Sequence, residues 1–233
     1  MTTLLELVKV KSATVRVLHW VIFLATVDLL LTGLYVGSPA ALLSGTGEPY
    51  QTFVMAKIRL LHFAGAIALA AAFLLRLYLA FFSAFHRDWR EVLPTAKNIA
   101  EAVDTIRYYW TFEGRLKEYR WVDPLDGLTF LALFLAVLAQ VFTGFALYAP
   151  GIELNSGILG AWAATIHFMT GWTSWLFGGL PGVRLAHHLT QWIIVSGALL
   201  HVYLQVWKTI KLRRANISAM VGGYKLMAAR KGE

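Results

Sequence analysis

Four long apolar runs dominate this sequence, and each is long enough to cross a lipid bilayer. They cover residues 17–36, 55–82, 125–149 and 183–210. A helix of about 20 apolar residues spans the hydrocarbon core of a membrane. The chain is 58% hydrophobic and only 15% charged, whereas a soluble domain carries about 25% charged residues. The sequence therefore predicts an all-α integral membrane protein, a four-helix bundle that forms a single domain over residues 1–233.

The distribution of basic residues predicts how these helices are oriented. With four spans, 17 of the 21 lysines and arginines fall on one side, in the N-terminal segment, the loop 83–123 and the C-terminal tail. Because the cytoplasmic side of a membrane protein carries the excess of such residues, both termini are expected in the cytoplasm. This flanking pattern also accounts for the net charge of +8, so we predict no nucleic-acid partner.

Two segments outside the four runs are predicted to lie at the membrane surface. Residues 95–110 place apolar residues at helical spacing from Ile99 to Trp110, as interfacial helices do. Residues 158–180 are apolar enough to form a fifth span, but they contain several glycines, hydroxyl residues and clustered aromatics. We favour an amphipathic external segment there, because a fifth span would export the basic C-terminal tail.

Histidines in the apolar runs are the strongest functional signal. His187 and His201 are 14 residues apart in one run, so on a helix they leave nearly the same face, about 21 Å apart. In the predicted orientation, His201 lies at the depth of His19, and His187 lies at the depth of His62. Two imidazoles at one depth on neighbouring helices suit a six-coordinate b-type haem. The sequence therefore predicts two haems, one held by His19 with His201 and one by His62 with His187.

The histidines also have interpretations other than haem ligation. A lone histidine in a membrane helix often hydrogen-bonds a neighbouring helix instead of a metal, and a zinc site would need carboxylate or thiolate ligands nearby. His188 points nearly opposite to His201, yet it stays the alternative to His187 because sequence does not set helix rotation. His86 and His167 are predicted to be structural.

The amino-acid composition limits which cofactors and which classes of protein are possible. The chain has no cysteine, which excludes disulfides, cysteine-ligated iron–sulfur clusters and covalent c-type haem. A transporter is disfavoured, because transporters usually contain internal repeats and this chain shows only a faint echo between LTGLY (31–35) and FTGFALY (142–148). A passive anchor for another subunit is a third class, and it would carry no cofactor.

Charged residues in or beside the runs have two interpretations each. Asp28 lies near the middle of the first run and is expected to face protein or water instead of lipid. It either takes part in proton uptake to a quinone or hydrogen-bonds a neighbouring helix. Basic residues at the membrane faces either pair with haem propionates or only set topology; they are Arg16, Lys57, Arg59, Arg184 and Lys208.

Pieces spread over nearly the whole chain resemble the cytochrome b subunit of membrane-bound nickel–iron hydrogenases. They include RVLHW (16–20), KIRLLHF (57–63), DPLDGLTF (123–130), HHLTQWIIVSGALLHVY (187–203) and ISAMVGGYK (217–225). The histidine scaffold alone is shared with the cytochrome subunits of formate dehydrogenases and with b561-type cytochromes. The phrases IRLLHF and ISAMVGGYK favour the hydrogenase branch.

The resemblance implies a di-haem subunit of the bacterial cytoplasmic membrane that anchors a hydrogenase small and large subunit on the external face. Electrons from hydrogen oxidation would pass from the small subunit's iron–sulfur clusters through the haems to quinone. By resemblance, His62 and His187 match the ligands of the external haem, and His19 and His201 match those of the cytoplasmic haem. Asp28 departs from the family pattern, where an apolar residue is expected, and so does the second histidine directly after His187.

Overall fold

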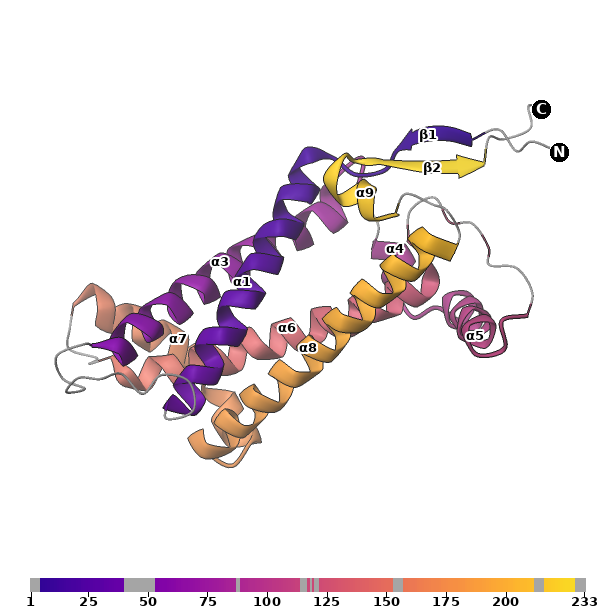
Figure 1. The fold of residues 1–233 in the computed structure, drawn as a ribbon. Helices are drawn as coiled ribbons and strands as arrows, with labels where there is room; N and C mark the ends of the chain where they lie inside the picture. Colours follow the sequence, from indigo (N-terminus) through magenta and orange to yellow (C-terminus); the bar gives the residue numbers. More distant parts are fainter. Residues whose placement is uncertain are drawn as a thin grey trace. The chain divides into compact units, whose positions relative to one another are not determined.

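The computed structural model describes residues 5–39, 53–86, 89–113, 117, 119, 122–152, 157–211 and 216–228. Its elements are β1 (Leu5–Lys9), α1 (Ala13–Gly37), α3 (Val54–Phe82), α4 (Trp89–Val92), α5 (Ala96–Thr111), α6 (Pro124–Tyr148), η2 (Ala149–Gly151), α7 (Ile158–Leu176), α8 (Leu180–Lys211), α9 (Asn216–Val221) and β2 (Tyr224–Ala228) (Figure 1). The chain divides into two compact units, one of Met1–Arg90 with Gln205–Glu233 and one of Glu91–Leu204, and the boundaries between them fall within α4 and within α8. The single domain over residues 1–233 stays a prediction.

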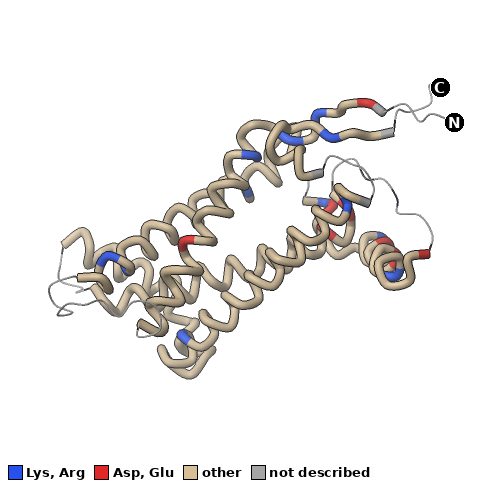
Figure 2. Tube along the Cα trace, in the orientation of Figure 1, with Lys and Arg blue, Asp and Glu red and all other residues tan. Residues whose placement is uncertain are grey.

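Four helices in the described part of the chain are long and apolar enough to cross a membrane. They cover Ala13–Gly37, Val54–Phe82, Pro124–Gly151 and Leu180–Ile210, and each contains one of the four predicted apolar runs. In α8, no charged residue occurs between Arg184 and Lys208, which leaves the long uncharged stretch seen in Figure 2. The prediction of four membrane-length helices is confirmed.

The orientation of these helices in a membrane stays a prediction. Several basic residues on which it depends lie outside the described residues, as does most of the loop predicted between the first two runs, at 40–51. These basic residues are Arg87, Arg115, Arg120, Arg213, Arg214, Arg230 and Lys231.

In the first unit, α1 and α3 lie side by side and pack closely at Gly65 (Figure 1). A Cβ atom at Gly65 would collide with the carboxylate of Asp28 on α1 and would lie 3.4 Å from Leu29 Cγ. Glycine is therefore the residue that lets the two helices approach. The contact also confirms that Asp28 faces protein, as expected for an ionisable group in an apolar helix.

Replacing this glycine should loosen the helix pair. We expect Gly65→Ala to destabilise the protein by about 1–3 kcal/mol, since overpacking a close contact forces the neighbouring groups apart. The double variant Gly65→Ala with Asp28→Ala should regain most of the lost stability, because the colliding carboxylate is gone. Thermal unfolding in detergent measures both effects, and equal losses in the single and double variants would contradict the packing role.

A two-stranded antiparallel sheet joins the two ends of the chain within the first unit (Figure 1). Its register pairs Leu5 with Ala228 and Lys9 with Tyr224. The turn before β2 contains Gly223, whose φ of +89° suits glycine, and a Cβ there would lie 2.7 Å from the carbonyl oxygen of Lys11. The prediction of an all-α fold missed this sheet, and the terminal piece ISAMVGGYK is α9 followed by the glycine turn and the start of β2.

His86 has a structural role in the same unit. It follows α3 and is buried, and its Nε2 accepts a hydrogen bond from the backbone N–H of Ser12 at 3.1 Å. Ser12 is the N-cap of α1, where its Oγ accepts from Val15 N–H. His86 therefore links the end of α3 to the start of α1, in agreement with its predicted structural role.

In the second unit, α5 packs against α6. The helix predicted at 95–110 is confirmed as α5, and Thr95 caps its N-terminus by accepting from Asn98 N–H at 3.2 Å. Tyr119 donates its phenolic proton to Glu101 of α5 at 3.0 Å. Burial raises the pKa of Tyr119, and the hydrogen bond to Glu101 raises it further, so the phenol stays a donor at neutral pH. That α5 lies on the membrane surface stays a prediction.

The segment predicted to be external and amphipathic folds as one continuous helix, α7, that packs on α6. Its buried face consists of Ile166 and of small and hydroxyl residues, which include Ala163, Thr170 and Thr173. Tryptophans contact α6, with Trp172 5.9 Å from Phe142 and Trp162 6.5 Å from Phe145 between ring centroids. Among the described residues, α7 is not one of the helices apolar enough to span, in line with the choice of four spans.

Candidate functional site

His187 on α8 contacts three residues of α6. Its Nδ1 lies 2.9 Å from the hydroxyl oxygen of Thr143, and the side-chain amide of Gln140 donates to its Nε2 at 3.1 Å. The ring fits beside Gly144, where a Cβ atom would come within 3.2 Å of His187 Cε1. These contacts hold the imidazole against α6, and they settle that His187 is on the side of α8 that faces this helix.

His62 on α3 has a similar environment in the first unit. Its Nδ1 lies 2.9 Å from the hydroxyl oxygen of Thr32 on α1. Thr32 is buried and donates its own hydroxyl proton to the backbone oxygen of Asp28 at 2.6 Å. The side chain of Asp28 contacts Gly65, which is one turn along α3 from His62. A carboxylate and a hydroxyl group of α1 therefore both lie near this histidine.

His201 lies toward the other end of α8 and also faces α6. Its ring centroid is 5.2 Å from that of Phe130, with the planes tilted by 56°. Since Phe130 and Thr143 are 13 residues apart on α6, and His187 and His201 are 14 apart on α8, the two antiparallel helices keep nearly the same register. Both histidines therefore leave α8 toward one neighbouring helix, at two levels.

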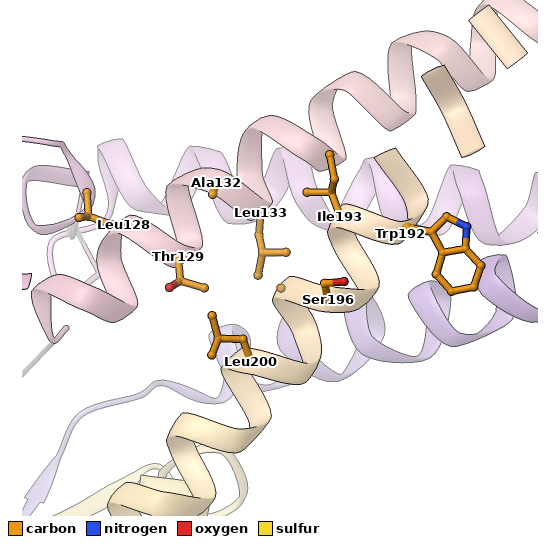
Figure 3. Close-up of a pocket in the computed structure, with 9 residues that line it drawn as sticks. Leu128, Thr129, Ala132, Leu133, Trp192, Ile193, Ser196 and Leu200 are labelled. Carbon is orange, nitrogen blue, oxygen red and sulfur yellow. The ribbon is translucent and has the colours of Figure 1, made fainter. Parts of the chain in front are cut away.

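An open apolar cavity of about 630 Å³ lies between α6 and α8 in the second unit. Figure 3 shows its wall, which is lined by Leu128, Thr129, Ala132, Leu133, Trp192, Ile193, Ser196, Gly197 and Leu200. Leu200 directly precedes His201, and Gly197 lies one turn before it on α8. A Cβ atom at Gly197 would lie 2.6 Å from Leu133 Cδ2. The volume falls in the usual range for ligand pockets, about 300–1,000 Å³.

The remaining histidines occupy different settings. His19 is half-buried on α1, with its ring 5.5 Å from that of Trp20. His188 is half-buried beside His187, its ring 6.5 Å away and turned by 76°. His167 is exposed on α7. Each predicted ligand pair takes one histidine from each compact unit, so the pairings of His19 with His201 and of His62 with His187 stay predictions.

Sequence reasoning missed the polar partners of the histidines. Thr32, Gln140 and Thr143 were not recognised as parts of a site, although the echo between LTGLY and FTGFALY contains both threonines. The similarity between the two pieces is too weak to indicate a transporter repeat. Its aligned Thr-Gly pairs were the signal that could have identified the two threonines.

Four helices of membrane length, with histidines at two levels of one of them, are what an integral membrane cytochrome of b type requires. The profile of the family described as Prokaryotic cytochrome b561 matches residues 10–223, and the chain belongs to this family. Membership in a family of b-type cytochromes implies haem b as the cofactor.

Curated relatives cover nearly the full chain. A protein of Azotobacter vinelandii is 36% identical over 94% of this chain and 88% of its own length, and it is named "Probable Ni/Fe-hydrogenase B-type cytochrome subunit". A protein of Cupriavidus necator with the same name is 34% identical over 93% of this chain and 86% of its own length. One of Escherichia coli K12, "Probable Ni/Fe-hydrogenase 1 B-type cytochrome subunit", is 29% identical over 92% and 88%. The predicted resemblance to these cytochrome subunits is confirmed.

The residues around His187 fit a haem ligand. The amide of Gln140 donates to Nε2, so Nε2 is the unprotonated ring nitrogen; to bind iron, its lone pair must exchange the hydrogen bond from Gln140 for the metal. The amide oxygen of the same residue, Gln140 Oε1, is buried without a hydrogen bond in the described part of the chain. Buried polar atoms normally have a hydrogen-bond partner, so this oxygen has room for a donor that the described residues do not supply. Gly144 leaves room for the ring.

Proposed function

We propose that this chain is the cytochrome b subunit of a nickel–iron hydrogenase complex in the bacterial cytoplasmic membrane. It carries electrons through two haems b, one held by His19 with His201 and one by His62 with His187, and passes them to membrane quinone. The observation that carries the proposal is that His187 and His201 both face α6 from levels 14 residues apart. At 1.5 Å per residue these levels are about 21 Å apart along the helix, most of a ~30 Å hydrocarbon core.

Haem b supplies a one-electron iron couple when it is bound. The chain supplies the imidazoles, and neutral histidine nitrogens are the ligand atoms. Apolar side chains of α6 and α8 line the pocket that includes Leu200, the residue before His201, and in a membrane the helices satisfy their own backbone hydrogen bonds. The side chain of Asp28 contacts Gly65, which is one turn along α3 from His62, so a carboxyl group of α1 lies near this proposed ligand.

The proposed partners are a hydrogenase small subunit and large subunit bound at the external face. The names of the relatives from Azotobacter vinelandii and Cupriavidus necator support a hydrogenase association. This chain has no cysteine, so iron–sulfur clusters with thiolate ligands and the hydrogen chemistry must belong to other subunits. Both termini are proposed to be cytoplasmic, and the β1–β2 sheet that joins the chain's two ends supports an even number of spans.

A second candidate is a cytochrome subunit of a formate dehydrogenase-like complex or a stand-alone b561-type cytochrome. The description of the matching family, Prokaryotic cytochrome b561, favours keeping this candidate. It shares the histidines and the haems with the first proposal, but it has no hydrogenase partner. The partner is therefore what separates the two functions.

Copurification from native membranes tests the partner. We expect the tagged chain in mild detergent to bring down the hydrogenase small and large subunits, and we expect hydrogen gas to reduce the b-type haem in isolated membranes. Deleting the chain should abolish hydrogen-dependent quinone reduction but keep hydrogen oxidation with a soluble dye. Copurification with formate dehydrogenase subunits, or purification of the chain alone with haem that hydrogen does not reduce, would decide for the second candidate.

A further inference from the structure

We propose that Thr32 and Thr143 are positioning residues, which hold His62 and His187 in the tautomer that presents Nε2 to a metal. This inference rests on the proposed function, because it concerns two of the four proposed haem ligands. It goes further in that it assigns a role to two hydroxyl groups outside the ligand set. The same arrangement occurs independently in the two compact units of the chain.

The direction of the Thr143 hydrogen bond follows from counting protons. A threonine hydroxyl has one proton, and Thr143 donates it to the backbone oxygen of Ala139 at 2.7 Å, with Gln140 O at 3.2 Å as a second acceptor. The oxygen of Thr143 therefore accepts its contact with His187 Nδ1 at 2.9 Å, and Nδ1 carries the ring proton. Gln140 donates to Nε2, which requires the same tautomer.

The same count applies to Thr32. Its hydroxyl proton goes to the backbone oxygen of Asp28 at 2.6 Å, and its oxygen lies 2.9 Å from His62 Nδ1. In a neutral imidazole one nitrogen is a donor and the other an acceptor. Nδ1 is the donor here, so the lone pair of His62 is on Nε2.

The two threonines share a sequence context as well as a geometry. Each precedes a glycine, in LTG (31–33) and FTG (142–144), and each is on the helix that packs beside the helix with the histidine. At Gly144 the missing side chain leaves the space that the ring of His187 occupies. Gly33 is buried on α1. The sequence similarity between the two pieces therefore corresponds to two equivalent threonine–histidine contacts.

A purely structural role would not need the imidazole. Threonines in membrane helices often donate back to the carbonyl four residues earlier and satisfy themselves in that way. Thr26 does so on α1, with its hydroxyl 2.7 Å from the oxygen of Ile22. Thr32 and Thr143 add a contact in which the same oxygen accepts from a ring N–H. Hydrogen bonds of this kind fix the tautomer and ring orientation of metal-ligating histidines.

The experiment compares Thr32→Val and Thr143→Val, which remove the acceptor at similar volume, with Thr32→Ser and Thr143→Ser, which keep it. Thr26→Val is the matched control. Haem affinity is measured by titrating haem into the haem-free proteins, and the midpoint potential by spectroelectrochemistry. We expect each valine variant to weaken binding at one site roughly 10–100-fold and to shift the potential of that haem. The serine variants and Thr26→Val should match the wild type in both measurements.

The tautomer itself is read in the haem-free wild-type protein by nitrogen NMR with labelled histidine. We expect the signals that vanish in His62→Ala and His187→Ala to show a protonated Nδ1. A protonated Nε2 at these residues, or valine variants with wild-type haem affinity and potential, would overturn the inference. A wild-type chain that binds no haem would instead overturn the proposed function, and the NMR result would still decide the tautomer. Circular dichroism melting shows whether a valine variant has lost its fold.

Discussion

His62→Ala and His201→Ala should each remove one of two b-type haems from the purified protein. Each histidine is proposed as an axial ligand of a different haem, and alanine offers the iron no ligand. The double variant should contain no haem. A pyridine haemochrome assay gives the number of haems per chain, and a reduced-minus-oxidised spectrum shows which of the two components is lost.

The controls for this experiment are two other histidines. His167 is exposed on α7, so His167→Ala should keep both haems. His188→Ala should also keep both, whereas His187→Ala should lose one, since the ring of His187 contacts α6. Loss of haem in His188→Ala but not in His187→Ala would overturn the ligand assignment on α8. Two haems in His62→Ala or in His201→Ala would overturn the proposed pairs.

Gly144→Val should have the second-largest effect, because it removes the space beside His187. A Cβ atom at this position would lie 3.2 Å from His187 Cε1 and 3.9 Å from Nδ1, and the branched methyl groups would push the ring away from Thr143. We expect the haem content to fall from two toward one per chain, with the spectral component lost in His187→Ala missing here too. Overpacking of this kind also costs about 1–3 kcal/mol of stability.

Gly171 on α7 provides a matched control for this substitution. A Cβ atom there would lie 3.8 Å from His167 Cε1, which is ordinary van der Waals contact with a histidine that the proposal does not use. Gly171→Val makes the same exchange of residues in a helix and should keep both haems. Gly144→Val with two haems and an unchanged spectrum would show that the ring does not need this space.

Much of the fold follows from local sequence patterns. The four predicted apolar runs lie within the four membrane-length helices, because the length and composition of a run are enough to predict a span. The helix at 95–110 was also recognisable from its apolar spacing, which is a local signal, and the structure adds Thr95 as its N-cap. The spacing of His187 and His201 is a property of one helix, and the prediction that they share a face agrees with their contacts to α6.

Other features depend on contacts between distant parts of the chain. The strands Leu5–Lys9 and Tyr224–Ala228 are each five residues long and pair across almost the whole sequence, so neither has a strong signal of its own. The choice of His187 over His188 as the ring that faces α6 needed the rotation of α8. The hydroxyl contacts of Thr32 and Thr143 needed the register between neighbouring helices.

The sequence by itself determined that this is a membrane protein with four apolar helices and histidines at two levels of one helix, because hydrophobic length and helical spacing are read along a single segment. Only the tertiary structure decided which atoms surround those histidines. Side-chain contacts depend on how each helix is rotated about its axis and shifted along its neighbour. Because most faces of an apolar helix have a similar composition, the sequence does not show which face packs against the neighbour. Close approach at Gly65 and Gly144, and the hydrogen bonds of the two threonines, select that face.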